Sequence, residues 1–288
     1  LDLDRLDGLD VVFLGLPHEA SMALVPQLAG KVGLVVDLSA AYRLKDASLY
    51  PQWYGFHHDQ PDELARARFG LPELFRTELI GASLIATPGC HVTAAALALE
   101  PLVRAGLIEP TGIIVDSKTG ISGAGRSLKH GSLFCSVDED LQAYGLLDHR
   151  HTPEIEQVVG SSLAHGQACQ VLFTPHLAPL NRAILATCYA RPTGSGTPTT
   201  ATLLDALREA YAGEPFVVVG EQSPSTKAAL GTNTSFLTAR YDERTGTVMA
   251  ICAIDNLCKG ASGGAIQAAN VALGLDETAG LQKVGLYP

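Results

Sequence analysis

The feature that most constrains the fold is a pair of nearly all-apolar runs near the start of the chain, at residues 10–16 and 32–38. A helical stretch at residues 19–29 separates them. Strands that are buried on both faces read as continuous apolar runs, whereas half-exposed strands alternate apolar and polar residues. The start of the chain therefore predicts an α/β domain, in which a doubly wound parallel sheet carries helices on both faces.

A phosphate-binding loop of the G-x-G-x-x-G type follows neither apolar run. In a dinucleotide-binding fold this loop binds the pyrophosphate through backbone N–H groups at a helix N-terminus. We therefore expect the first βα units of the domain to be missing, which leaves the two strands short of a neighbour. On this expectation the 288-residue chain, expressed alone, binds a dinucleotide poorly and tends to aggregate.

The length of 288 residues exceeds the usual size of a single core, so two domains are expected. Apolar and polar residues alternate along the runs between residues 170 and 254, which favours a second domain with an antiparallel sheet. Residues 43–80 are polar and aromatic, and they predict a long connection with short helices.

Charge and cysteine usage exclude several classes of protein. The formal net charge of −10 disfavours capture of nucleic acid or of an anionic membrane. No apolar run reaches 18 residues and no basic-then-apolar leader is present, so we expect an untargeted cytoplasmic protein. The six cysteines form no C-x-x-C pair, which favours free thiols over disulfides or a structural zinc site.

Cys90 is the first candidate for chemistry. An apolar run at residues 83–86 passes through Pro88-Gly89 into an alanine-rich helix, which places Cys90 at the helix start. Unpaired N–H groups and the positive end of the helix dipole favour a thiolate there. Most cysteines are small buried hydrophobes, so the position alone does not establish a nucleophile. We predict that Cys90 is the most reactive of the six thiols.

Two histidines, His149 and His151, precede a helix that we expect to begin with Thr152 as N-cap and Pro153 in its first position. An imidazole that titrates near neutral pH suits a general acid or base. A metal site is disfavoured, because no third ligand lies at a recognisable spacing.

Two further segments are candidate ligand contacts. The loop at residues 119–126 follows an apolar strand, and its glycines permit close backbone approach while Ser122 and Arg126 supply donors. A flexible turn is the competing interpretation. Near the C-terminus, Asn256 and Lys259 open a helix of small residues, where they either meet a ligand or serve packing alone.

Four collinear motifs carry a resemblance to a known family: Pro-Gly-Cys at 88–90, Ser-Gly-Ala-Gly-Arg at 122–126, His-Arg-His-x-Pro-Glu-Ile-Glu-Gln at 149–157 and Asp-Asn-Leu-x-Lys-Gly-Ala at 255–261. Together they resemble the N-acetyl-γ-glutamyl-phosphate reductases, which are related to the aspartate-semialdehyde dehydrogenases. The resemblance implies a Rossmann-type NADPH domain at residues 1–90 and 258–288. It also implies an α+β catalytic and dimerisation domain with a mixed or antiparallel sheet at residues 91–257.

The implied reaction is reductive dephosphorylation of N-acetyl-glutamyl 5-phosphate to the 5-semialdehyde through a cysteine thioester, as part of arginine biosynthesis. The implied assembly is a homodimer or homotetramer. Carried over by position, the resemblance makes Cys90 the nucleophile and one of the two histidines the acid/base, with Glu154 to orient it. The remaining implied contacts are Arg43, Ser122, Arg126 and Arg182 for the substrate and Pro17, His18, Ser39, Ser122, Gly123 and Asn256 for NADPH.

Two other functions remain open from the sequence. A lysine-pathway paralogue reduces an aminoadipyl phosphate derivative that is one methylene longer, and one methylene changes binding by only about 1–3 kcal/mol. The other is a truncated, non-catalytic relative that retains the dimer domain. The sequence also leaves open whether His149 or His151 is the acid/base.

Overall fold

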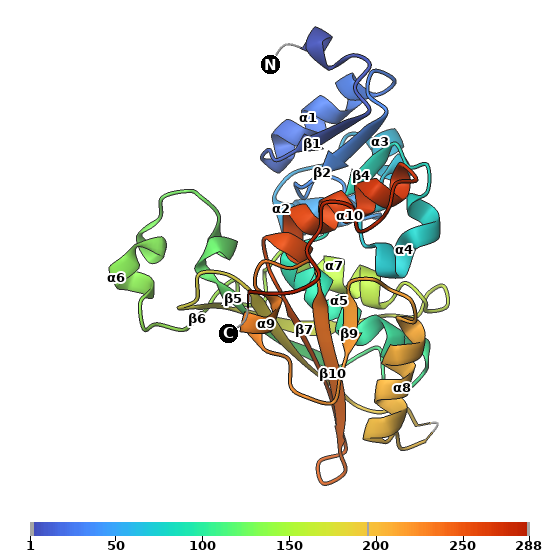
Figure 1. The fold of residues 1–288 in the computed structure, drawn as a ribbon, viewed down its shortest axis with the longest axis vertical. Helices are drawn as coiled ribbons and strands as arrows, with labels where there is room; N and C mark the ends of the chain where they lie inside the picture. Colours follow the sequence, from blue (N-terminus) through green and yellow to red (C-terminus); the bar gives the residue numbers. More distant parts are fainter. Residues whose placement is uncertain (1–2, 195, 287–288) are drawn as a thin grey trace. The chain divides into compact units, whose positions relative to one another are not determined.

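The computed structural model describes residues 3–194 and 196–286, which divide into two compact units. Unit 1 comprises Leu1–Gly89 and Ala261–Leu281, so a segment near the C-terminus belongs with the N-terminal part of the chain. Unit 2 comprises Cys90–Gly260 and Gln282–Pro288. Figure 1 labels the elements of both units.

Unit 1 is built on a four-stranded sheet in which all the strands are parallel, in the order β1-β2-β4-β3. Within the described residues β1 pairs with β2 alone, so it forms one edge of the sheet. The two predicted apolar runs are present as β1 and β2, and their parallel pairing fits the predicted doubly wound sheet. The strands are β1 (Val11–Leu14), β2 (Leu34–Asp37), β3 (Arg68–Phe69) and β4 (Leu84–Ala86).

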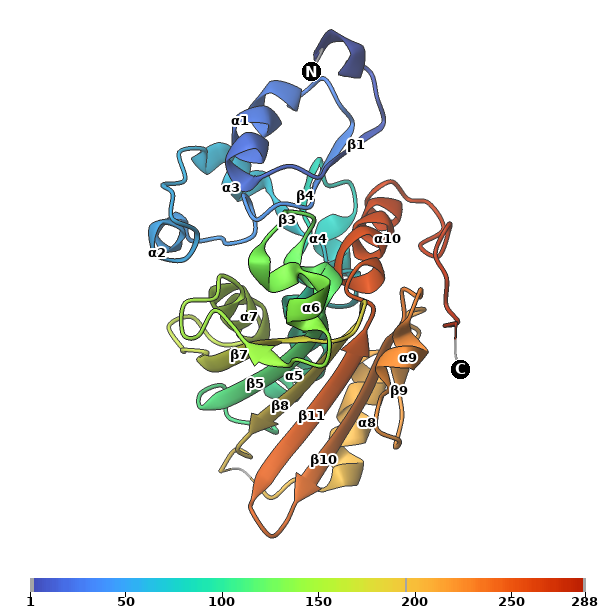
Figure 2. The same cartoon turned by 90° about the vertical axis from the view of Figure 1, so that its left-hand side faces the viewer.

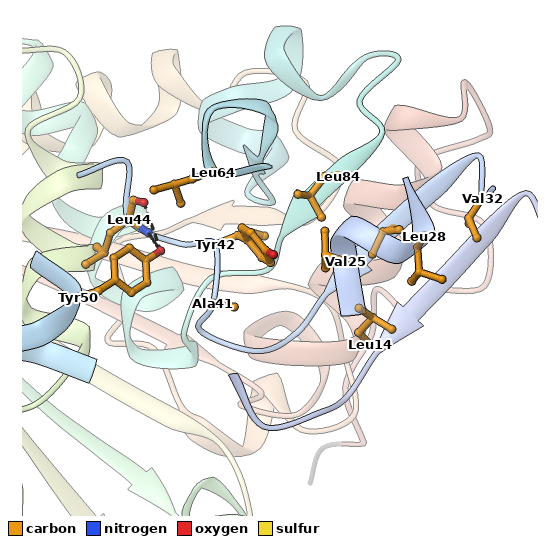
Figure 3. Packing of buried hydrophobic residues seen from close by; sticks show 12 residues of the cluster. Leu14, Val25, Leu28, Val32, Ala41, Tyr42, Leu44, Tyr50, Leu64 and Leu84 are labelled. Atoms are coloured by element: carbon orange, nitrogen blue, oxygen red, sulfur yellow. Dashed lines mark hydrogen bonds between the residues drawn. The ribbon is translucent and has the colours of Figure 1, made fainter. Parts of the chain in front are cut away.

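Both faces of β2 are buried, which explains why its residues before Asp37 are all apolar. Leu34 and Val36 pack on one face against small residues of α10 (Gly263–Ala272). Val35 points to the other face, where α1 (His18–Leu28) and the segment after β2 complete a second cluster. Figure 3 shows this second cluster, including the hydrogen bond between the Tyr50 hydroxyl and the backbone of Leu44.

The long connection predicted at residues 43–80 contains short helices, as expected. It also contains β3, which the sequence did not predict because two residues carry no detectable alternation. The helical elements of this connection are η2 (Ala47–Leu49), α2 (Tyr50–Tyr54), α3 (Pro61–Arg66) and α4 (Pro72–Leu79), and η1 (Leu3–Leu6) precedes the first strand.

Unit 2 is built on a seven-stranded sheet in the order β6-β7-β5-β8-β11-β10-β9, whose long strands are visible in Figure 2. The β5–β7 and β9–β10 pairs are parallel and the other pairs are antiparallel, so the sheet is mixed. The strands are β5 (Ile113–Gly120), β6 (Gln142–Ala143), β7 (Val171–Ala178), β8 (Ile184–Ala190), β9 (Val217–Val219), β10 (Ser235–Asp242) and β11 (Thr247–Ile254).

Helices cover one face of this sheet. The central helix α5 (Cys90–Arg104) packs against β8, β10 and β11, and its residues 91–103 are all buried. It is flanked by α7 (His151–Val159) and by α8 (Thr200–Ala210). The small side chains of α5 permit this close packing, and the alanine-rich sequence after Cys90 is therefore explained by its position in the core.

The opposite face of the sheet carries exposed apolar side chains. Ile114 of β5 lies directly beside Leu172 of β7 and Tyr189 of β8 in the strand register, and all three are at least one-third exposed. Val218 of β9 is also about half exposed. We call the face that carries these four residues the open face.

Residues 121–150 form an arm between β5 and α7, and in Figure 1 its helix α6 projects away from the sheet of unit 2. The arm returns to the sheet through β6, which pairs antiparallel with β7. Its elements are η3 (Ile121–Ala124), η4 (His130–Ser132), α6 (Phe134–Val137) and β6; α9 (Thr226–Ala229) and the π-helical turn η5 (Cys258–Ser262) complete the unit.

Among the described residues, no helix combines the length and the apolar character that a bilayer crossing requires. Within the same residues, no group of three or more His, Cys, Asp or Glu side chains is arranged to hold a metal ion.

Candidate active site

Cys90 is the first residue of α5, as predicted, and it is half-buried. Its position depends on the turn η5, which follows β11. A Cβ atom on Gly260 would lie 2.8 Å from the Cβ of Cys90, a distance that real Cβ atoms do not adopt. Glycine at position 260 therefore allows the Asp255–Gly260 segment to pack directly against the candidate nucleophile.

Most of the other thiols are placed where a thiolate is disfavoured. Burial raises the pKa of both Cys169 and Cys188 to about 12. Burial also raises the pKa of Cys258, helped by the negative charge of Asp255 and opposed by Arg182. Cys252 is fully buried in β11, and Cys135 is exposed on the arm.

A cluster of imidazole and aromatic rings surrounds the start of α5. The ring of His91, the residue after Cys90, lies 6.1 Å from the ring of His149 and 5.8 Å from that of His151, measured between centroids. The rings of His149 and His151 are 4.7 Å apart. Phe173 of β7 contacts His91 and His149 through its ring, so the cluster has an apolar wall.

The hydrogen bonds of His149 define what its ring is able to do. Its Nδ1 accepts the backbone N–H of His151 at 3.1 Å. Burial, assisted by the charge of Arg150, lowers the pKa of His149 to about 4, so the ring is neutral near pH 7. In a neutral ring whose Nδ1 is an acceptor, the proton is on Nε2. His149 is therefore arranged as a hydrogen-bond donor, with its lone pair already occupied.

His151 and Glu154 are both on α7. His151 is only 6% exposed, and Glu154, three residues further along the same helix face, is fully buried. The predicted helix start was wrong by two residues: α7 begins at His151 with Arg150 as N-cap, and Pro153 is the third helical residue. Because the bond from the His151 N–H to His149 Nδ1 satisfies a free N–H of the first turn, a Thr152 cap is not needed.

Ser122 and Asn256 are 134 residues apart in sequence, and the structure brings them together. The Asn256 amide donates to the Ser122 hydroxyl at 3.0 Å, and its carbonyl oxygen accepts the backbone N–H of Ala183. Gly123 lies in the same turn, where a Cβ would approach Thr119 Oγ1 to 2.8 Å. Asn256 thus links the loop after β5 to the start of β8.

Arg182, the third member of this region, is paired inside unit 2. Its Nε and one Nη each lie 2.9 Å from oxygens of the fully buried Asp255, and the Nη also approaches Cys258 Sγ at 3.3 Å. Asp255 accepts the backbone N–H groups of Gly231, Leu257 and Cys258 as well. The guanidinium is held in a two-point contact with a buried carboxylate, which fixes the Asp255 turn that supports Cys90.

Arg126 lies in the exposed loop after η3, and the structure does not bring it into the hydrogen-bonded group of Ser122, Asn256 and Arg182. The other predicted contacts belong to unit 1. Arg43 is nearly buried and donates from an Nη to the carbonyl of Leu38 at 3.1 Å.

The remaining cofactor candidates lie just beyond the carboxyl ends of β1 and β2. Pro17 is the N-cap of α1, and His18 is its first residue and stacks on Phe56 at 5.3 Å. The hydroxyl and the backbone N–H of Ser39 both donate hydrogen bonds to the buried Asp37 carboxylate, so the hydroxyl hydrogen is already used within the protein. Ligands of doubly wound sheets bind at this edge, so the positions fit a nicotinamide dinucleotide, with backbone groups as the available contacts at Ser39.

Three members of the site were missed from the sequence: His91, Tyr144 and Ser117. His91 Nδ1 lies 2.7 Å from the Ser117 hydroxyl, and its Nε2 lies 3.2 Å from the Tyr144 hydroxyl. Only the adjacency of His91 to Cys90 was a usable signal. Ser117 comes from β5 and Tyr144 from the arm, and no motif links those segments.

Comparison with known proteins agrees with this geometry. Residues 1–82 match the family model described as "Semialdehyde dehydrogenase, NAD binding domain", and residues 90–256 match "Semialdehyde dehydrogenase, dimerisation domain". Proteins named N-acetyl-gamma-glutamyl-phosphate reductase are similar over nearly the whole chain. The protein of Symbiobacterium thermophilum is 48% identical over 99% of this chain and 82% of its own length. That of Desulforudis audaxviator is 47% identical over 100% of this chain and 83% of its own length.

The chain belongs to the N-acetyl-gamma-glutamyl-phosphate reductase family. The resemblance drawn from the sequence motifs is thereby confirmed. Solved structures of aspartate semialdehyde dehydrogenase share the fold of this reductase family member. The enzyme II of Vibrio cholerae has a TM-score of 0.67 at 16% identity and covers 91% of this chain and 79% of its own. The Francisella tularensis enzyme has a TM-score of 0.66 at 15% identity, covering 92% and 82%.

Proposed function

We propose that this protein reduces N-acetyl-glutamyl 5-phosphate to N-acetyl-glutamate 5-semialdehyde with release of phosphate, as an enzyme of arginine biosynthesis. The observation that carries this proposal is a half-buried cysteine at the first position of α5 beside three histidines, in a chain up to 48% identical to named reductases. The close relatives favour the glutamyl substrate over its aminoadipyl homologue, because all those compared bear the reductase name.

Cys90 is the proposed nucleophile. Its sulfur forms a bond to the acyl carbon of the substrate while the bond from that carbon to the phosphate oxygen breaks. The resulting thioester accepts hydride more readily than a carboxylate does, which is the reason for a covalent route. Once the acyl carbon is reduced, the carbon–sulfur bond breaks, the semialdehyde leaves and the thiolate is restored.

The two histidines have different proposed roles. His149 carries its proton on Nε2 and is suited to donate a hydrogen bond to a negatively charged oxygen of the substrate. His151, on the same cluster, is the proposed acid/base that exchanges a proton with Cys90 and the product oxygen. Glu154 is one helical turn from His151 and is the proposed orienting group.

Unit 1 is the proposed cofactor domain, for which the sequence predicted residues 1–90 and 258–288, and unit 2 is the proposed catalytic and dimerisation domain, for which it predicted residues 91–257. Residues 90, 258–260 and 282–288 belong to unit 2 instead. When bound, NADPH is the hydride donor that this reduction requires. Pro17, His18 and Ser39 are the proposed contacts in unit 1, and Ser122, Gly123 and Asn256 those in unit 2. Arg43 and Arg126 are proposed to bind charged groups of the substrate, as a guanidinium suits phosphate.

Arg182 remains a proposed substrate contact through its exposed part only. About one-third of its side chain is accessible, while two of its nitrogens face Asp255. Its main contribution is to hold the Asp255 turn. This supports the substrate site indirectly, because Gly260 of that turn packs on Cys90.

The family model that matches residues 90–256 is described as a dimerisation domain, which supports an oligomeric protein. We propose a homodimer, or a homotetramer built from it, in which the open face is buried. Its row of Ile114, Leu172 and Tyr189 is the apolar surface that such an interface covers. The described cysteines are all free, which supports a reducing compartment, the cytoplasm.

Turnover of a matched pair of cysteine variants tests the proposal. Cys90→Ser should abolish phosphate-dependent reduction of NADP⁺ by N-acetyl-glutamate semialdehyde, because the thioester cannot form. Cys258→Ser is the control, since Cys258 belongs to the supporting turn η5, and it should retain most of the activity. Retention of turnover by Cys90→Ser would overturn the proposed chemistry. Equal rates with the glutamyl substrate and its aminoadipyl homologue would overturn the proposed substrate.

A further inference from the structure

The chain belongs to unit 2 again from residue 282 onward, and the segment that follows packs on the loop before β10. We call residues 282–286 the strap. The carbonyl of Gln282 accepts the backbone N–H of Asn233 at 2.8 Å, and the carbonyl of Lys283 accepts the Thr234 hydroxyl at 2.8 Å. Asn233 and Thr234 are almost fully buried. The strap is therefore bound to the loop through its own backbone.

The strap approaches the loop most closely at Gly285. A Cβ atom on Gly285 would overlap the backbone oxygen of Ala228 and lie 3.3 Å from the Thr232 side chain. The next residue, Leu286, donates its N–H to the carbonyl of Leu230 at 3.3 Å. Because the obstructing atom belongs to the backbone, a side chain at position 285 would push the strap away from the loop.

One peptide group joins the strap to the turn that supports Cys90. The carbonyl of Leu230, which accepts the Leu286 N–H, and the N–H of Gly231 belong to the same planar peptide. That N–H donates to Asp255 Oδ2 at 2.8 Å. The C=O and N–H of a trans peptide point in opposite directions, so the peptide is bonded to the strap on one side and to Asp255 on the other.

This peptide is the centre of a β-turn from Ala229 to Thr232. The N–H of Thr232 donates to the carbonyl of Ala229 at 3.1 Å. Leu230 has φ −59° and ψ 126°, and Gly231 has φ 73°, which are the angles of a type II turn. A type I turn differs by a flip of the central peptide, and the flip would direct the Gly231 N–H away from Asp255. Glycine adopts both forms, so contacts outside the turn select one of them.

We propose that the strap holds the Gly231 peptide in the orientation in which its N–H binds Asp255, and thereby positions Cys90. Asp255 begins the turn that is closed by the Gly260 N–H, and Gly260 packs directly on Cys90. Without the strap the peptide flips more readily, Asp255 loses a donor, and the turn loosens beside the thiol. The inference rests on the proposed role of Cys90 as nucleophile.

The expected effect is partial, because Asp255 keeps other partners when the Gly231 N–H is lost. Arg182 still pairs with the carboxylate, and the backbone N–H groups of Leu257 and Cys258 still donate to it. Loss of one hydrogen bond to a buried charge should therefore change local opening and turnover by about 10-fold while the protein remains folded.

Hydrogen–deuterium exchange of Gly285→Ala, in the absence of substrate and cofactor, is the first test. Exchange should become about 10-fold faster in the peptides that cover residues 228–234 and 255–262, because the first are held by the strap and the second by Asp255. Exchange in the central strands β5 and β8 should stay unchanged, which shows that the variant is folded.

Two variants of Thr234 make the same comparison without a clash. Thr234→Val removes the hydroxyl that donates to the strap and should speed exchange in both peptides about 3-fold. Thr234→Ser keeps the hydroxyl and should restore the exchange of the unmodified protein. This pair decides the question if Gly285→Ala does not fold.

Turnover shows whether the strap acts on Cys90. Gly285→Ala should lower kcat and kcat/KM equally, by about 10-fold, because positioning is lost and uniform substrate binding is not. Gly231→Ala should have a similar effect, since alanine disfavours a φ of 73° whereas its Cβ would meet Leu286 at an ordinary 3.6 Å. The double variant should add little, because both changes act on one peptide.

Gly246→Ala is the matched control. Gly246 also has a positive φ, 64°, but it lies in the turn between β10 and β11, and its Cβ position has no atom within 4 Å. This variant should lower stability and leave kcat and the exchange of residues 255–262 unchanged.

Faster exchange at residues 228–234 with unchanged exchange at residues 255–262, in Gly285→Ala or in Thr234→Val, would overturn the proposal, because the strap would then hold only the loop. Equal losses of kcat in Gly285→Ala and Gly246→Ala would also contradict it. Failure of the proposed function is distinguishable: the unmodified protein would then lack turnover, whereas the exchange measurement needs no substrate.

Discussion

Acid should destabilise this protein through two buried neutral histidines, and the size of the effect follows from their surroundings. Burial lowers the pKa of His91 to about 3 and that of His149 to about 4, against an ordinary value of 6.5. Between those values the unfolded chain binds more protons than the folded chain, so the free energy of unfolding falls as the pH falls below 6.5. More than about one pH unit above 6.5 both states are neutral, and the two residues contribute almost no pH dependence.

A pH of 5 lies about 1.5 pH units below the pKa that each histidine has in the unfolded chain. Protonation of the unfolded chain therefore lowers the free energy of unfolding by about 2 kcal/mol per histidine, at about 1.4 kcal/mol per pH unit. The pair therefore lowers the free energy of unfolding by about 4 kcal/mol between pH 7 and pH 5. With an unfolding entropy of about 2.1 cal/mol/K per residue, 288 residues give about 0.6 kcal/mol/K, so the melting temperature should fall by about 7 °C.

Circular dichroism melts at pH 7 and pH 5 measure this difference, and His91→Phe isolates one of the two groups. The variant has a lower melting temperature at both pH values because Ser117 and Tyr144 lose a partner, but its pH-dependent drop should be about half, near 3 °C. Glu100 and Glu156 have pKa values raised by burial and gain stability as the pH falls, but they affect both proteins alike.

His165→Phe, at an exposed position, is the matched control and should keep the full drop. An equal drop in the unmodified protein and in His91→Phe would refute the assignment of acid sensitivity to the buried ring.

Three further outcomes are expected. Gly120→Ala should lower the free energy of unfolding by about 3 kcal/mol in urea melts, because its Cβ would lie 2.6 Å from the backbone of Arg182; an unchanged melt would contradict the close approach. Arg182→Ala should cost about 3 kcal/mol by leaving Asp255 buried without its cation, and Arg182→Lys less; equal losses would rule out the two-point contact. His151→Asn should reduce kcat at least 100-fold and change the pH profile of kcat, whereas His149→Asn should reduce kcat less and keep the profile; the reverse order would exchange their roles.

The sequence predicted most elements of the fold because their patterns are local. The strand at residues 184–190 and the helix that starts at Cys90 agree with the structure at the predicted positions. The alternation of apolar and polar residues favoured an antiparallel sheet in the second half, whereas the family resemblance implied a mixed or antiparallel one, and the sheet is mixed. The connection from β5 to β7 passes through the arm and α7, so the two strands pair in parallel, and no alternation pattern distinguishes that pairing from an antiparallel one.

The site was predictable only where its residues lie within motifs. Cys90, His149 and His151 were identified because a helix start and an unusual pair of histidines are visible in one stretch of sequence. Ser117 and Tyr144 were missed, since each reaches His91 from a different element and neither is unusual for its own segment. The ion pair between Arg182 and Asp255 could not be predicted from the sequence either, because the two residues are 73 positions apart.

The central claim is that the substrate is carried as a thioester on Cys90, and trapping that intermediate tests it most directly. The protein is mixed with N-acetyl-glutamyl 5-phosphate in the absence of NADPH, quenched in acid and examined by intact-mass and peptide mass spectrometry. The account predicts one N-acetyl-glutamyl group per chain, located on the peptide that contains Cys90 and absent from Cys90→Ser. An acyl group on another residue, or full turnover with no acylated protein at any time, would contradict it.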